Sequence, residues 1–141
     1  MEYHFKIKKE SKGYSAVCVE LPGCVTQANS REELESSMKD ALNLYLDEPS
    51  DSKLIFPLPK KKVLNAVSIT VDSSIAFAFA LRRARLKNKL TQTQAKDLIG
   101  ITGSLNNYQR LENSRTANPV LDTLVRIKRA FPDFPIELVA S

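Results

Sequence analysis

The chain has 141 residues and a net charge of +5, so it is long enough for one domain or two small ones. Its two cysteines, Cys18 and Cys24, match neither a CxxC motif nor a dense disulfide framework, which excludes a small disulfide-stapled secreted domain. No stretch approaches the roughly 18 apolar residues of a membrane span, and the N-terminus lacks a signal-peptide core. We expect a cytoplasmic protein without a membrane partner.

Charge divides the sequence more sharply than length does. Residues 1–48 carry a net charge of −3, residues 49–62 carry +3, and residues 63–141 carry +5. An acidic front part suits a basic protein partner, whereas a basic rear part suits phosphate groups. We therefore predict a front domain at 1–48, a linker at 49–62, and a rear domain at 63–141.

The front part predicts a small antiparallel sheet and one helix. Residues 3–7 alternate in polarity and predict a strand, a turn at Lys12 and Gly13 follows, and residues 14–20 and 24–27 predict two more strands. Ser30 and Glu33 form a capping box before a helix whose apolar stripe can cover one sheet face. The stripe comprises Leu34, Met38, Ala41, Leu42 and Tyr45.

Residues 63–71 alternate again and predict a strand after the proline-containing linker. An isolated strand leaves its backbone groups unpaired, so it must join the front sheet or the same strand of a second copy. We favour the second copy. With Ile75, Phe77 and Phe79, this strand is the predicted dimer seam, because these apolar residues exceed what a small helical bundle can bury.

The remaining sequence predicts four helices, at 75–88, 91–99, 105–113 and 120–131, and hence a compact bundle. The predicted core comprises Ala80, Leu81, Ala84, Leu98, Tyr108, Leu111, Leu121, Leu124 and Ile127. The basic run of the first of these helices is typical of a solvated surface; it comprises Arg82, Arg83, Arg85, Lys87 and Lys89. The fold class is therefore α+β: a small antiparallel sheet with a packed helix, joined by a linker and strand to an all-α domain.

Residues 91–113 read TQTQAKDLIGITGSLNNYQRLEN: a helix that opens on Thr-Gln, a glycine break, and a second helix rich in amides. With Tyr108 and Leu111 buried, the outward positions are Asn106, Asn107, Gln109 and Arg110. Asn and Gln can bond to adenine and Arg to guanine. Arg115 follows the helix and suits a phosphate. This pattern is typical of a helix-turn-helix that binds double-stranded DNA, although an ordinary solvated face on a protein-binding bundle is the alternative.

Residues 81–138 resemble the lambda-repressor-type helix-turn-helix. In that family the Gln after the opening Thr contacts a phosphate, which implies that Thr91 and Gln92 clamp the DNA backbone here. The interval from Gly100 to Glu112 is slightly longer than in that family, so the frame of the second helix stays open. Ser104 is the preferred N-cap and a further candidate DNA contact, with Thr102 as the rival N-cap.

Residues 13–48 contain G-Y, E-L-P-G and V-T-Q-A before an acidic amphipathic helix. In this they resemble the HicB antitoxin domain, which usually has Gly where Ala28 stands. The resemblance implies a partial RNase-H-like fold that has lost nuclease chemistry and binds a small, basic, mRNA-cleaving HicA-like toxin. Glu20 is the only acid within the three predicted strands, and His4 lies on the polar face of its strand, where we expect a surface role. We expect no enzyme activity, no metal and no cofactor.

Together these features predict the antitoxin of a type II toxin–antitoxin system that neutralises its toxin and represses its own operon. We expect a homodimer or higher homo-oligomer, because one helix-turn-helix contacts too few bases. Two alternatives remain: a solitary helix-turn-helix transcriptional regulator with a sensor domain, and a minimal RNase-H-like nuclease with a DNA-binding tail.

Overall fold

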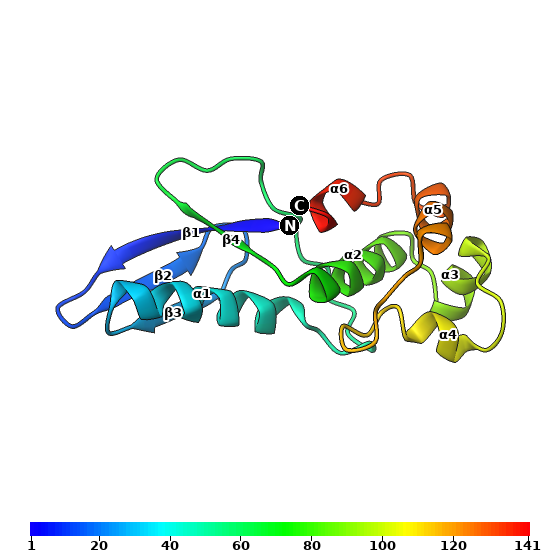
Figure 1. Cartoon of the computed structure of the whole chain (residues 1–141), viewed down its shortest axis with the longest axis horizontal. Helices are drawn as coiled ribbons and strands as arrows, with labels where there is room; N and C mark the ends of the chain where they lie inside the picture. The colour runs from blue at the N-terminus through cyan, green and yellow to red at the C-terminus, as the bar shows by residue number, and fades with distance from the viewer. The chain divides into compact units, whose positions relative to one another are not determined.

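A computed structural model describes residues 1–141 as an α+β protein with a four-stranded antiparallel sheet and six helices (Figure 1). The strands are β1 (Glu2–Lys9), β2 (Tyr14–Cys18), β3 (Val25–Ala28) and β4 (Val67–Thr70). The helices are α1 (Arg31–Leu46), α2 (Ser73–Lys87), α3 (Gln92–Ile99), α4 (Leu105–Gln109), α5 (Leu121–Ala130) and α6 (Ile136–Val139). None of the six helices has both the length and the apolarity needed to cross a membrane.

The chain forms two compact units. The sheet unit contains Met1–Leu46 and Phe56–Asp72, and the helical unit contains Asp47–Ile55 and Ser73–Ser141. The chain therefore passes from one unit to the other three times. The segment predicted as a linker, residues 49–62, is divided between the two units.

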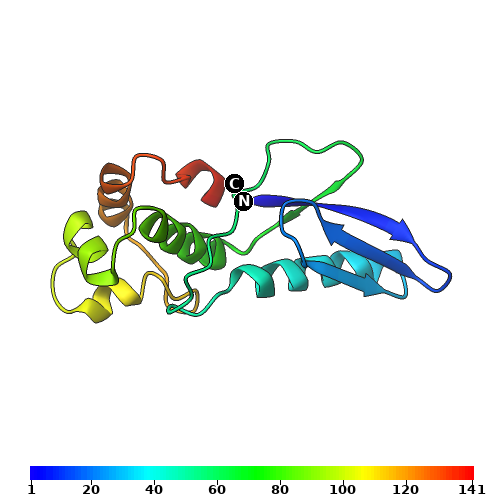
Figure 2. The same ribbon diagram turned by 180° about the vertical axis from the view of Figure 1, so that it is seen from behind.

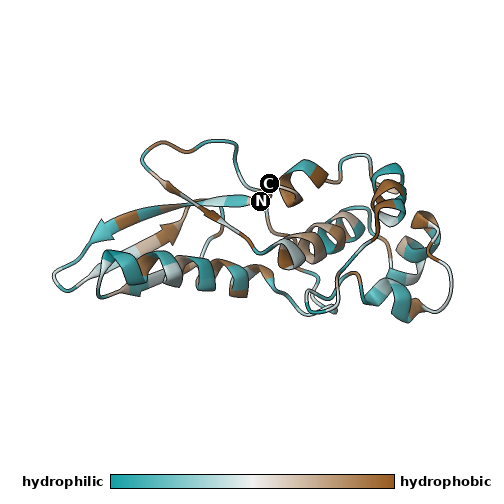
Figure 3. Ribbon diagram, viewed as in Figure 1, coloured by the Kyte–Doolittle hydropathy of each residue, from teal (hydrophilic) through white to brown (hydrophobic).

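The sheet has the strand order β3-β2-β1-β4, with every neighbouring pair antiparallel. Alternation along β1, visible in Figure 3, places Tyr3 and Phe5 in the core with no exposed area. The turn between β1 and β2 requires Gly13, which has a φ of +84°, and an added Cβ there would clash with the carbonyl oxygen of Ala28. The predicted three-stranded meander is thus confirmed, with a fourth strand added beside β1.

The position of β4 differs from the prediction of a pairing between two copies. Tyr3 pairs with Ile69 and Phe5 with Val67, so β4 completes the sheet of its own chain. The polarity pattern of residues 63–71 predicted a strand correctly but could not choose between the two possible neighbours. Pairing within the chain prevails because β1 has a second open edge, and the segment that precedes β4 is hydrogen-bonded to the same sheet unit. Tyr3 Oη donates to the carbonyl oxygen of Pro57 at 2.7 Å.

Helix α1 lies along one face of the sheet, as the opposite views of Figures 1 and 2 show. Ser30 Oγ accepts a hydrogen bond from the Glu33 N–H at 3.2 Å, as the predicted cap requires. The predicted stripe is confirmed, because Leu34, Met38 and Leu42 are buried. On the other end of the helix, Leu46 is also buried before the chain enters the helical unit.

The helical unit buries Ala80, Leu81, Tyr108 and Ile127, as predicted. Two predictions for its core are wrong, because Leu98 is 55% exposed and Leu121 is 77% exposed. Helix α3 turns Ala95 and Ile99 inward, and α5 turns Ile127 inward, so these leucines fall on outer faces. The predicted seam is also corrected: Phe77 and Phe79 are 3% and 2% exposed, and Phe77 meets Phe134, which precedes the unpredicted α6, edge-on at a centroid distance of 6.0 Å.

Candidate nucleic-acid interface

Helix α3 begins with a complete capping box. Thr91 Oγ1 accepts from the Gln94 N–H at 3.1 Å, and Gln94 Oε1 accepts from the Thr91 N–H at 2.9 Å. Gly100 ends the helix in the left-handed conformation with a φ of 85°. The helix thus starts at the predicted Thr-Gln pair and presents the positive end of its dipole there.

Helix α4 is shorter than the predicted 105–113. Ser104 occupies the predicted N-cap position, but its side chain makes no capping hydrogen bond, and the helix ends at Gln109. Beyond this point Leu111 N–H bonds to the Tyr108 carbonyl and Glu112 N–H to the Gln109 carbonyl. These are i→i−3 bonds, so the chain tightens into turns instead of continuing the α-helix.

A buried carboxylate, Glu112, connects α2, α3 and α4. It accepts from Arg85 Nε at 2.7 Å and Nη2 at 3.0 Å, from the Tyr108 hydroxyl, and from Gln92 Nε2 at 3.3 Å. The Arg85 and Glu112 side chains are only 8% and 0% exposed. This corrects the prediction that the basic run of α2 is surface, since Arg82 and Arg85 are both buried. Because Arg85 follows buried Leu81 by four residues, helical spacing was the available signal.

The ionisation of this cluster follows from its burial and charge. Burial lowers the pKa of the Arg85 guanidinium, but the hydrogen bonds and charge of Glu112 outweigh this effect and raise it overall. Burial and the Glu112 carboxylate both raise the pKa of the Tyr108 hydroxyl. The hydroxyl is therefore protonated at neutral pH and donates to Glu112. The result is a buried ion pair whose acceptor oxygens are occupied by donors.

Gln92 links this buried cluster to the surface. Its Nε2 donates to Glu112, and its Oε1 accepts from Gln109 Nε2 at 3.0 Å. Both glutamines are half-buried. Gln109 is thus held by Gln92, and Gln92 is held in turn by the buried carboxylate of Glu112.

The other predicted contacts lie around this pair. The exposed set comprises Thr91, Ser104, Asn106, Asn107, Arg110 and Arg115. Asn107 has a local role, because its Nδ2 donates to the Thr102 carbonyl at 3.1 Å and supports the turn before α4. The structure thus brings Gln92 together with Gln109, leaves Asn106 and Arg110 exposed beside them, and turns the amide nitrogen of Asn107 toward its own backbone.

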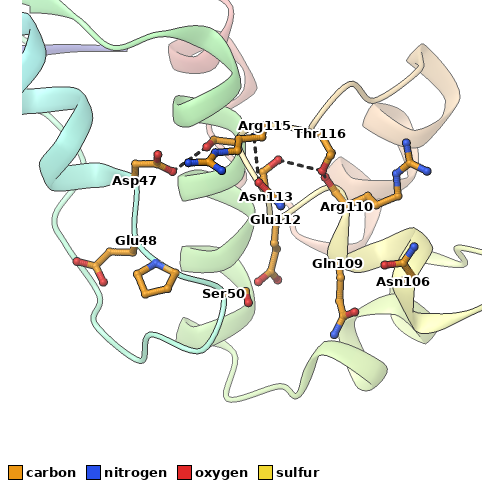
Figure 4. Close-up of a pocket in the computed structure, with 12 residues that line it drawn as sticks. Asp47, Glu48, Ser50, Asn106, Gln109, Arg110, Glu112, Asn113, Arg115 and Thr116 are labelled. Atoms are coloured by element: carbon orange, nitrogen blue, oxygen red, sulfur yellow. Dashed lines mark hydrogen bonds between the residues drawn. The ribbon is translucent and has the colours of Figure 1, made fainter.

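A groove of about 740 Å³ runs beside α4 within the helical unit (Figure 4). Its lining includes Asn106, Gln109, Arg110, Arg115, Asp47 and Glu48. Asp47 Oδ1 accepts from Ser114 Oγ at 2.7 Å, and the Glu48 carbonyl accepts from Arg82 Nη1 at 3.2 Å. These two acidic residues were not predicted near the amides, because they lie almost 60 positions earlier in the sequence and no local pattern marks the contact.

The sheet unit contains a second buried polar cluster, and it corrects the surface position predicted for His4. His4 is 6% exposed; its backbone N–H and Nδ1 bond to the two oxygens of Glu20 at 3.0 and 2.7 Å. The Lys60 N–H also donates to Glu20, at 3.0 Å, so the segment before β4 covers this face. Burial alone would raise the pKa of Glu20, but these hydrogen bonds hold it below its ordinary value.

Cys18 and Cys24 are free and buried, and no group of three or more His, Cys, Asp or Glu side chains is positioned to hold a metal ion. No protein-family model matches the chain. A UPF0150 protein from Helicobacter pylori is 36% identical over 63 residues, which is 45% of this chain and 88% of that protein. A UPF0150 protein from Archaeoglobus fulgidus is 46% identical over 48 residues, 33% of this chain and 70% of that protein. The match to the Helicobacter pylori protein is 36% identical and covers 88% of that protein, so the chain belongs to the UPF0150 family.

Proposed function

We propose that this protein is the antitoxin of a type II toxin–antitoxin system. In this proposal the sheet unit, a partial RNase-H-like domain, binds a small basic HicA-like toxin. The helical unit, a helix-turn-helix, binds double-stranded operator DNA as part of a homodimer and represses the operon. The front-half motifs that resemble HicB, the charge distribution and the geometry around α3 and α4 support it.

The hydrogen bond between Gln92 and Gln109 is the observation that carries the DNA-binding part. Gln92 lies in the first turn of α3, where free N–H groups and the helix dipole favour a phosphate. Gln109 lies on α4 and offers an amide that can bond to a base edge. A DNA backbone held at α3 would therefore bring a base to Gln109, with Asn106 and Arg110 as exposed neighbours.

The buried cluster below supports this use of the two glutamines. Glu112 holds Gln92, and Gln92 holds Gln109, so the reading group is oriented before DNA arrives. Preorganisation of this kind reduces the ordering cost of binding. An ordinary solvated face would not require amides to be positioned by a charged group in the core.

The charge of the sheet unit supports the proposal that this unit binds a toxin. The acidic side chains of α1 are exposed, namely Glu32, Glu33, Glu35 and Asp40. Complementary charge of this kind raises the association rate with a basic partner. We infer a structural role for Glu20 instead of a catalytic one, because His4 and Lys60 already bond to its oxygens.

Binding of the intact protein to the DNA upstream of its own gene tests the DNA-binding part. With fluorescence anisotropy, we expect Gln109→Ala to reduce the preference for this DNA over a scrambled duplex by about 1–3 kcal/mol. Gln92→Ala should weaken both complexes, because it removes the proposed phosphate contact, and should reduce the preference less than Gln109→Ala does, because Gln109 stays present but loses the side chain that orients it. Gln27→Ala, an exposed glutamine of β3, is the matched control. No sequence preference in the parent protein, or an equal loss on both duplexes for Gln109→Ala, would refute the assignment.

Co-purification with any small basic protein encoded beside this one tests the proposed binding of toxin. The double variant Glu33→Lys and Asp40→Lys should slow the association several-fold and reduce its dependence on salt. The double variant Asp133→Lys and Glu137→Lys, at two exposed positions of the helical unit, makes the matched charge change elsewhere. An association rate that does not change in the α1 variant would remove the role of this helix.

A further inference from the structure

Helix α5 carries apolar side chains on two different faces. Ile127 is buried in the helical unit, yet Val120, Leu121 and Val125 are 67%, 77% and 39% exposed. Leu121 and Val125 are four residues apart and are therefore neighbours on one side of the helix. Figure 3 shows both hydrophobic and hydrophilic residues along α5. An exposed apolar row on a helix that already has a packed face indicates a surface for another molecule.

The charges along the same side of α5 have a definite polarity. Asp122 lies in the first turn and Arg129 in the last turn, and both are exposed. They are seven residues apart, so they lie two turns from each other on one side of the helix. Asp122 bonds to Arg126 at 2.9 Å within its helix, whereas Arg129 makes no ion pair in the chain. Along this side Leu121 comes first, the Asp122–Arg126 ion pair and Val125 follow, and Arg129 comes last, so the charge left without an ion pair in the chain is basic and lies at the end.

We infer that α5 is the seam between two copies of this chain, packed antiparallel against α5 of the second copy. A two-fold axis near Val125 then brings the two Val125 side chains together. It also brings Asp122 of each copy to Arg129 of the other. Residues are self-complementary in this way only in an isologous interface, in which the same patch meets itself.

The charge pattern selects this occupant. A parallel arrangement would place Asp122 against Asp122 and Arg129 against Arg129, which is unfavourable. The groove beside α4 contains none of Val120, Leu121 and Val125, so self-association leaves it free. The inference supplies the dimer that the proposed function needs, but it does not depend on DNA binding. It also replaces the seam predicted from Phe77 and Phe79, which are buried in their own chain.

A crosslinking experiment on the intact protein tests whether Val125 lies at the axis. Val125→Cys should form a disulfide-linked dimer readily under mild oxidation with diamide, because the two introduced thiols face each other. Leu44→Cys, at a position of α1 that is 80% exposed, is the control and should crosslink slowly. The native cysteines are buried. Equal crosslinking of the two variants, or a parent protein that stays monomeric in sedimentation equilibrium, would overturn the inference.

A charge exchange tests the antiparallel direction. Asp122→Arg should weaken the dimer about tenfold or more, because it places like charges at both ends of the seam. Adding Arg129→Asp in the same chain restores opposite charges across the axis and should recover the dimer. Circular dichroism checks that each variant is folded. A double variant that dimerises no better than Asp122→Arg would rule out this arrangement. A dimer that binds no DNA would contradict the proposed function but not the seam at α5.

Discussion

Replacing Glu112 by glutamine keeps the shape of the side chain but removes the charge that faces Arg85. The two side chains are almost fully buried and joined by bonds of 2.7 and 3.0 Å, so the Arg85 guanidinium has little access to compensating water. Removal of one partner from a buried ion pair costs about 3–5 kcal/mol. The glutamine would also turn an amide donor toward donors of Arg85. We therefore expect Glu112→Gln to destabilise the helical unit by an amount of this order.

Urea unfolding followed by circular dichroism measures this loss, since the chain has no tryptophan to report by fluorescence. Because two compact units can unfold separately, hydrogen exchange of α3 and α4 locates the effect. The double variant Arg85→Met and Glu112→Gln lacks the uncompensated cation and should be more stable than Glu112→Gln alone. Glu137→Gln, at an exposed position, is the control. A Glu112→Gln protein within about 0.5 kcal/mol of the parent would refute a buried pair.

Three further perturbations test other parts of the structure. Asp47→Asn removes a carboxylate from the groove that also contains Arg115, so we expect DNA affinity to rise about two- to threefold at low salt and the gain to fade at high salt. Glu20 has a lowered pKa in the folded state. Its contribution to the free energy of unfolding is therefore complete above the ordinary glutamate pKa and is lost as the pH falls through the folded value. Glu20→Gln should not show this loss when its free energy of unfolding is measured against pH. Gly13→Ala should lower the free energy of unfolding by more than about 1 kcal/mol. Gly23→Ala is the control and should lower it less, because Gly23 has a similar φ but no close neighbour. Similar melting temperatures for the two variants would contradict the clash at Gly13.

Local patterns in the sequence were sufficient for most of the elements. Alternation predicted the strands around Phe5 and Ala16, and the Ser30 cap with its apolar stripe predicted α1. Thr91 and Gly100 marked the two ends of α3 correctly. Each of these features depends on residues within a few positions of each other, which is why the sequence alone reveals them.

Long-range contacts were beyond such patterns. The strand that contains Ile69 could satisfy its backbone on either of two partners, and only the folded chain shows that β1 takes it. Similarly, the burial of Arg85 depends on Glu112, 27 positions later, and the burial of His4 depends on Glu20 and the segment at Lys60. Helical spacing places Arg85 on the same side of α2 as buried Leu81, but no local pattern identifies the distant carboxylate that accompanies it into the core.

The path of the chain decides which truncations can be interpreted. A cut after residue 48 removes β1 and so leaves Val67–Thr70 without its pairing partner, an unpaired strand that invites association with other chains. The same cut removes Asp47 and Glu48 from the groove beside α4. A shortened protein would therefore change self-association and the proposed DNA-binding surface at once. Point variants in the intact chain separate toxin binding, DNA binding and dimer formation, because Asp40, Gln109 and Val125 each lie outside the other two proposed surfaces.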